Sequence, residues 1–190
     1  MLDLVNSVEI KNDKEAVDFV VKHLLTQNQK SECEGSCYYR SKDVLWYTDN
    51  EYDEHEYEFT GRACAAGALI KDSEYNEDFE NEPASDPHVI EAIKASHPGW
   101  NFNESSVKIV LTLQRIHDSF YPSEWPLLLT FFSEMVHEEH PLISTTTVED
   151  IMVEVKARAY TYLRENNIGF VAISANNLRN RMMGDNSNGQ

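Results

Sequence analysis

Three cysteines and one histidine in the first third of the chain have the side-chain chemistry that zinc prefers. Cys33 and Cys37 are separated by three residues, and His55 and Cys64 follow as single residues. Thiolate and imidazole ligands are typical of zinc sites, but structural sites usually bring their ligands in two tight pairs. Only the first pair is tight here. The alternative is that the cysteines act as small hydrophobic side chains, with Cys64 buried and Cys37 half-buried.

Cys64 and His117 form a second candidate set, this time for nucleophilic catalysis. A reactive thiolate needs a pKa lowered by a helix N-terminus or a neighbouring cation, and the sequence shows neither. Asp118 follows His117, but adjacent residues of a helix point about 100° apart. We therefore expect that Asp118 does not orient His117. A small metal- or thiol-dependent enzyme, or a ligand-binding protein, centred on Cys64 and His117 remains the alternative function.

The acidic residues are concentrated in one part of the chain. The net charge is −17, and residues 49–91 hold fourteen acids and two bases, a net charge of −12 that leaves −5 for the rest. Concentrated like charge opposes folding and speeds encounter with a basic partner, although solubility is an alternative role. Ten of these acids make up the predicted partner-binding surface: Asp49, Glu51, Asp53, Glu54, Glu56, Glu58, Glu74, Glu77, Asp78 and Glu80.

Other classes of site are disfavoured by the sequence. The seven glycines form no phosphate-binding loop, and Asp49 to Glu54 lack the spacing and central glycine of a calcium loop. Clustered Lys and Arg of the kind that bind nucleic acid are also missing. The pair His137 and His140 is typical of a helix C-terminus rather than a ligand set. We therefore predict no catalytic residue, no metal, no cofactor and no direct contact with nucleic acid.

The composition predicts one globular domain. Of 190 residues, 41% are hydrophobic and 26% are charged, which is enough apolar material for one core, predicted over residues 1–175 with a polar tail over 176–190. The apolar runs fall short of the roughly 20 residues that span a bilayer, and the N-terminus lacks a secretory pattern. Three cysteines cannot all pair, which indicates reduced thiols. We expect a soluble cytoplasmic protein that binds no membrane.

Helix patterns occupy most of the chain. Capping residues and apolar spacing predict a helix over about 13–27, and Asp86-Pro87 starts another that ends before Pro98-Gly99. A third begins at Ser105 or Ser106 and ends before Tyr121. A fourth is centred on residues 127–136 and ends before Pro141, and a fifth covers residues 148–163 after Thr147. The run of small residues at 63–70 is typical of a short, closely packed helix.

Strand patterns lie between the first and second helices. Aromatic and β-branched residues at 37–40 and 44–47 predict a hairpin with its turn at Ser41-Lys42-Asp43. Residues 57–60 alternate and predict a third strand, and the apolar run 168–174 is expected to complete the sheet. Runs of strands and runs of helices predict an α+β fold, in which a small antiparallel sheet packs against four or five helices.

Three short patterns resemble a group of small phage and prophage open reading frames without assigned chemistry. The resemblance covers roughly residues 37–120. It implies a phage accessory protein, of the kind that binds and inhibits or redirects a host protein such as a nucleic-acid enzyme or a defence factor. It carries over no functional residue. The patterns are Cys37-x-Tyr39-Arg40, Cys64-Ala65-x-Gly67-x-Leu69-Ile70-x-Asp72-x-x-Tyr75 and Leu113-Gln114-x-x-His117-Asp118.

Overall fold

The computed structural model describes residues 6–33, 36–44 and 57–168. Its first complete helix, α2 (Asp13–Gln27), begins where the sequence predicts it, because the Asn12 side chain accepts a hydrogen bond from the Glu15 amide. Asn28 ends the helix in the left-handed region at φ 49°, a conformation that Asn tolerates better than most residues. The prediction of a helix over 13–27 is confirmed.

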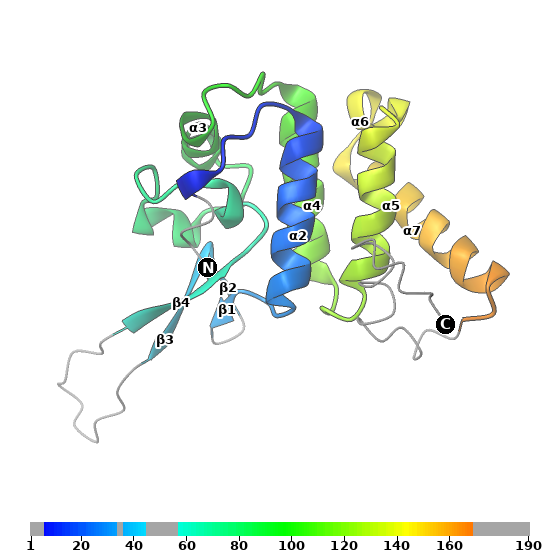
Figure 1. Cartoon of the computed structure of the whole chain (residues 1–190), viewed down its shortest axis with the longest axis horizontal. Helices are drawn as coiled ribbons and strands as arrows, with labels where there is room; N and C mark the ends of the chain where they lie inside the picture. Colours follow the sequence, from blue (N-terminus) through cyan, green and yellow to red (C-terminus); the bar gives the residue numbers. More distant parts are fainter. Residues whose placement is uncertain (1–5, 34–35, 45–56, 169–190) are drawn as a thin grey trace, which may run out of the picture.

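Four further helices lie in the second half of the chain. They are α4 (Glu104–Ser119), α5 (Trp125–His137), α6 (Pro141–Thr145) and α7 (Val148–Glu165). Asn103 and Thr147 begin α4 and α7 with capping boxes, in which side chain and backbone satisfy each other's end groups. In Figure 1, α2, α4 and α5 run side by side, with α7 crossing beside α5. The second predicted helix is α3 (Pro87–Ser96). All five predicted helices are therefore confirmed as α2, α3, α4, α5 and α7, with shifts of a few residues at their ends.

One hydrophobic cluster joins these helices. Each helix contributes the apolar stripe that its sequence shows, and Ile116, Ile151, Val155 and Leu163 are all buried in this cluster. Phe131 is only half-buried and packs against the cluster from outside. The largest fully buried side chains are Trp125, Phe132, Ile10, Leu24, Leu69, Ile70, Ile93, Ile109, Leu113, Ile116, Leu129 and Met135.

The strands do not form the predicted sheet. The short strands β1 (Glu32–Cys33) and β2 (Ser36–Cys37) pair with each other, and β3 (Arg40–Val44) pairs antiparallel with β4 (Tyr57–Ala63). The predicted turn at residues 41–43 is wrong, because these residues continue β3. Figure 1 shows the β3–β4 pair extending away from the helices.

The α+β prediction is wrong. The described part of the chain is mostly helical, and its strands form two separate antiparallel pairs instead of one sheet packed against helices. The physical reason is that, in the described part of the chain, β2 pairs only with β1 and β3 pairs only with β4, so the core is built by helices. Residues 168–174 were predicted to complete the sheet, but all of them after Ile168 lie outside the described part of the chain.

A mostly irregular segment links β4 to α3. It contains the 3₁₀ helices η1 (Gly67–Leu69) and η2 (Glu77–Asn81). Residues 63–70 are all buried, so the small side chains there do allow close packing, although the helix is a single 3₁₀ turn. Among the described residues, no helix is long and apolar enough to cross a membrane.

Candidate functional site

His117 lies in the last turn of α4 and is buried. Its Nε2 atom accepts a hydrogen bond of 3.2 Å from the Ser31 amide, and its ring stacks on Trp125 with the centroids 5.2 Å apart. Because an amide N–H can only donate, Nε2 carries no proton and the neutral ring is protonated on Nδ1. The nitrogen that a general base would use is therefore occupied by backbone.

Asp118 contacts His117, contrary to the prediction. Its Oδ1 atom lies 2.9 Å from Nδ1 of His117 and also accepts a 2.8 Å hydrogen bond from Gln114 Nε2. The 100° angle between adjacent helical residues fixes only the directions of their Cβ atoms. Beyond Cβ, the imidazole ring of His117 and the carboxylate of Asp118 extend toward each other. Asp118 thus fixes the orientation of His117, and Gln114 also accepts from the Ala66 amide at 3.0 Å. This network fastens residues 31 and 66 to α4.

Cys64 is buried, as the hydrophobic alternative predicts. Its Sγ atom accepts a 3.3 Å hydrogen bond from the Gly67 amide. A buried thiol whose contacts lie within its own turn is typical of a structural residue. Cys64 does not line the pocket between α2, α4, α5 and α6 or the groove between α5 and α7.

The predicted zinc ligands are only partly covered by the structure. His55 lies outside the described residues, and Cys33 and Cys37 are placed as backbone only, in β1 and β2. Within the described part of the chain, no group of three or more His, Cys, Asp or Glu side chains is arranged to hold a metal ion.

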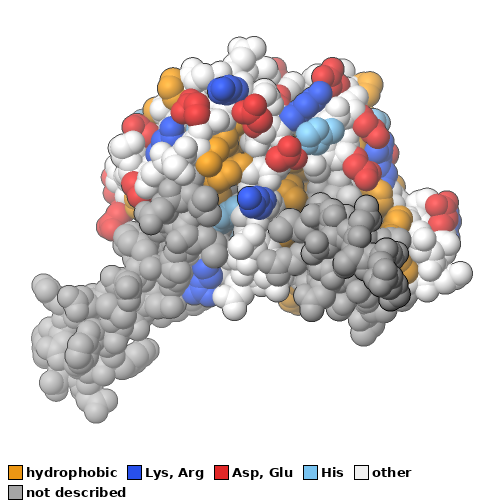
Figure 2. Space-filling model, in the orientation of Figure 1, with side chains coloured by type: hydrophobic (Ala, Val, Ile, Leu, Met, Phe, Trp, Pro, Cys, Tyr) orange, Lys and Arg blue, Asp and Glu red, His pale blue; other side chains and the backbone are white. Residues whose placement is uncertain are grey.

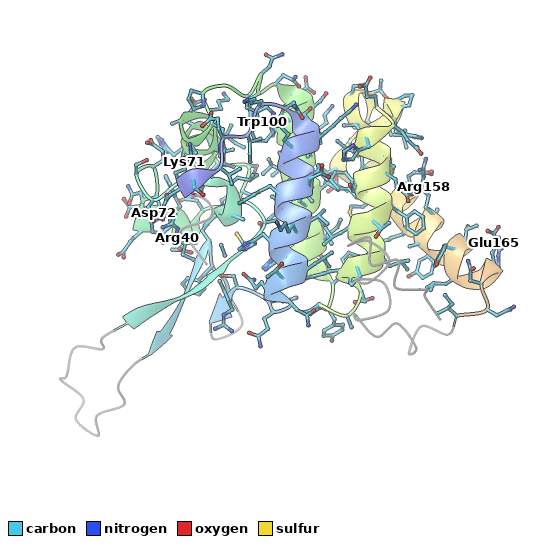
Figure 3. All side chains as sticks on the ribbon, in the orientation of Figure 1. Arg40, Lys71, Asp72, Trp100, Arg158 and Glu165 are labelled. Carbon is cyan, nitrogen blue, oxygen red and sulfur yellow. The ribbon has the colours of Figure 1, made fainter. Side chains whose placement is uncertain are left out.

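Arg40, which is buried, forms an ion pair with the exposed Asp72, and the sequence did not predict this contact. NH1 of Arg40 contacts Oδ1 of Asp72, NH2 donates to the Ile70 carbonyl at 3.0 Å, and the guanidinium lies 4.2 Å from the centre of the Tyr75 ring. Burial raises the pKa of Asp72, but hydrogen bonds from Asn6 and the charge of Arg40 outweigh it, so the net pKa is lowered. Arg40, Lys71 and Asp72 gather at one end of the molecule in Figure 3.

Glu80 is the acidic anchor of the same region. Its carboxylate accepts hydrogen bonds from the amides of Tyr39 at 2.7 Å and Arg40 at 3.1 Å, and from the Tyr75 hydroxyl. Burial and the charge of Glu80 raise the pKa of Tyr75 well above its ordinary value. Glu80 was predicted to face a partner, but the structure uses its carboxylate to hold the backbone at the start of β3.

The other predicted partner-binding acids divide into three groups. Glu77 and Asp78 are exposed in η2, and Glu74 is half-buried just before it. Glu58 is placed as backbone in β4. The remaining five lie outside the described residues: Asp49, Glu51, Asp53, Glu54 and Glu56. Of the ten predicted acids, the structure describes the side chains of Glu74, Glu77, Asp78 and Glu80, which are already neighbours in the sequence.

The residues of the three resemblance patterns contact one another. Arg40 meets Asp72 and Tyr75, Gln114 binds the backbone at Ala66, and His117 binds Asp118. Their spacing in sequence was visible, but their mutual contacts were not. They are the polar contacts that join β3, the segment 64–75 and α4.

A pocket of about 490 Å³ lies between the ends of α2, α4, α5 and α6. Ile109, Val136 and Ile143 form its apolar floor. Its volume suits a small ligand, but its charged groups are already engaged: Lys14 pairs with Glu139 at 2.8 Å, and Asp13 accepts hydrogen bonds from Trp100 and Ser106 outside the lining. Nothing in this pocket selects a ligand class.

No family model, curated protein or solved structure matches this chain.

Proposed function

We propose that this protein is a binding protein that docks onto a basic surface of a partner protein through its acidic segment, residues 72–82. The acids of this segment are Asp72, Glu74, Glu77, Asp78, Glu80 and Glu82, with no base among them. A nucleic-acid enzyme or a defence factor with a basic groove is the partner class that fits this charge.

The observation that supports the proposal is that some of these acids are held by contacts within the protein while others are exposed to solvent. Asp72 is exposed and Glu80 is half-buried, but both carboxylates are held: Arg40 and Asn6 bind Asp72, and two backbone amides bind Glu80. Glu77, Asp78 and Glu82 are exposed. Two carboxylates therefore fix the segment so that the others are presented on an ordered backbone, which reduces the entropy lost on binding.

The charge elsewhere supports the choice of this segment. Figure 2 shows acidic and basic side chains interspersed over the helices on the visible face. Several acids of the helices are paired, as Glu104 is with Lys108 at 3.1 Å and Glu154 with Arg158 at 3.0 Å. Paired charges contribute little long-range field, whereas residues 72–82 hold six acids and no base.

The buried candidates favour binding over catalysis. Cys64 is enclosed, and both ring nitrogens of His117 are engaged by Ser31 and Asp118. The thiol-dependent or metal-dependent enzyme centred on these residues gains no supporting contact among the described residues, so we do not propose it.

The test compares two variants with the same change in charge. Glu77→Gln with Asp78→Asn removes two acids from the start of η2, and Glu104→Gln with Glu149→Gln removes two from the first turns of α4 and α7. A partner captured by affinity purification of the wild-type chain is then measured by surface plasmon resonance. We expect the association rate to fall several-fold in the first variant and to lose part of its dependence on salt.

The matched variant controls for net charge and for loss of acids near a helix N-terminus. It should bind the partner with nearly the wild-type association rate, and circular dichroism should show both variants folded. Equal association rates for both variants would show that residues 72–82 serve solubility instead.

A further inference from the structure

A second surface of distinct chemistry lies between α5 and α7. It is a shallow groove of about 410 Å³. Phe131 and Tyr162, both half-buried, form its aromatic floor, with their rings edge to face at 5.8 Å between centroids. Glu134, Glu154 and Glu165 line its sides together with Arg158.

The charge of the groove is unbalanced. Arg158 is the basic residue of the lining, and it is already held by Glu154 at 3.0 Å and by Glu138 at 3.5 Å. These carboxylates raise the pKa of Arg158 and keep it charged. Glu134 and Glu165 are exposed and make no ion pair among the described residues. Two carboxylates without an ion pair to any described residue therefore lie beside an aromatic pair.

Aromatic rings and carboxylates share one preferred ligand, an organic cation. A Lys or Arg group is attracted to the face of an aromatic ring, and nearby carboxylates add a charge-assisted contact. The groove is shallow, so it suits a side chain that projects from a folded surface or a peptide better than an enclosed small molecule. We propose that the α5–α7 groove binds a Lys or Arg side chain of a basic protein partner.

This site is separate from the acidic segment of the proposed function. Figure 3 places Arg158 and Glu165 at the opposite end of the molecule from Arg40, Lys71 and Asp72. The groove proposal therefore does not need residues 72–82 to bind anything. A partner that is basic over a long surface would contact both sites, and a short peptide would contact one.

The test uses defined probes and a residue-resolved signal. The full chain labelled with ¹⁵N is titrated with the blocked single residues Nα-acetyl-lysine methylamide and Nα-acetyl-arginine methylamide. Nα-acetyl-norleucine methylamide, which keeps the aliphatic stem of lysine without its charge, is the control probe. We expect the two cationic probes to shift the amide signals of Glu134, Thr161 and Tyr162, and the neutral probe to leave them in place.

Two variants separate the contributions of charge and ring. Glu134→Gln with Glu165→Gln should weaken binding of the lysine probe about fivefold or more, because a charge pair in contact in water is worth about that factor. Tyr162→Leu keeps an apolar floor and should weaken binding roughly two- to fivefold. Glu104→Gln with Glu149→Gln makes the same change in net charge outside the groove and should bind the probe like the wild type.

Three results would overturn the groove proposal. One is equal shifts with the neutral probe, which would make the site merely apolar. Another is cation-induced shifts confined to residues 72–82, which would leave the proposed function standing without the groove. The third is movement of the groove signals, without any probe, in Arg179→Gln with Arg181→Gln, which would assign the groove to a cation of this chain, from residues outside the described part.

Discussion

At the scale of single residues, Gly67 has the least steric freedom of the described glycines. A Cβ atom at this position would overlap the carbonyl oxygen of Tyr39, and backbone cannot move aside as a flexible side chain can. We expect Gly67→Ala to lower the free energy of unfolding by about 1–3 kcal/mol, a typical cost of overpacking. Urea denaturation followed by circular dichroism measures the change.

Gly99 supplies the matched control for this substitution. A Cβ atom there would meet Oε1 of Glu9 at 3.5 Å, an ordinary contact. Gly99→Ala should therefore leave the urea midpoint nearly unchanged. Equal midpoints for both alanine variants would contradict the close approach of Tyr39 to Gly67.

The polar contacts at residue scale were the least predictable from sequence. Cys64 could be expected to be buried, because it lies in a run of small apolar residues. The pair of Arg40 and Asp72 could not, since 31 residues separate them and no local pattern encodes which acid a given base meets. The prediction that Asp118 does not orient His117 was wrong because the angle between adjacent helical residues takes no account of side-chain length.

At the scale of elements, α7 offers a direct test of burial. Val155 is 0% exposed and Val153 is 67% exposed, two positions apart on the same helix. Val155→Asp would place an unpaired carboxylate in the core and should cost more than about 3 kcal/mol of unfolding free energy. Val153→Asp should change it by no more than about 0.5 kcal/mol. Thermal melts of the two variants compare the positions, and similar melting temperatures would contradict the placement of α7.

Helices were predictable here because their signals are local. Asn12 and Thr147 cap their helices through residues three positions away, and the apolar stripe of α7 is visible within a few turns. Strand pairing depends on distant partners: Arg40 faces Ala63 in the β3–β4 register. The sequence therefore predicted the helices well, whereas it misplaced the turn at 41–43 and overestimated the sheet.

At the scale of the whole molecule, the half-buried His23 and the buried His97 make stability depend on pH. Burial lowers the pKa of both His23 and His97, so the unfolded chain takes up protons more readily than the folded one. His97 accepts from the Ile10 amide, and Lys71 and Glu9 are its charged neighbours. This stabilisation is complete above the ordinary histidine pKa of about 6.5. It is lost as pH falls from there toward the folded-state values.

We expect the free energy of unfolding to fall between pH 7.5 and pH 5.5, by up to about 1.4 kcal/mol per pH unit for each histidine. This window lies above the range in which the lowered carboxylates of Glu9 and Asp72 titrate, so it isolates the histidines. Urea unfolding across the window measures the slope. His23→Gln with His97→Gln should flatten it, and an unchanged slope in that variant would assign the pH dependence to other groups.

The fluorescence of the two described tryptophans can report on unfolding at the two ends of α4. Trp100 donates its indole N–H to Asp13 at 2.9 Å, beside Ser106 in the first turn of α4, whereas Trp125 donates to the Phe120 carbonyl at 3.2 Å and stacks on His117 in the last turn. Both indoles are buried, so their emission lies to the blue and moves to the red when water reaches them. Two variants each keep a single tryptophan: Trp46 and Trp125 are replaced by Phe in one, and Trp46 and Trp100 in the other. The fluorescence of each variant then reports on one end of α4. Separate red shifts during denaturation would resolve fraying of one end of this helix from cooperative loss of the whole.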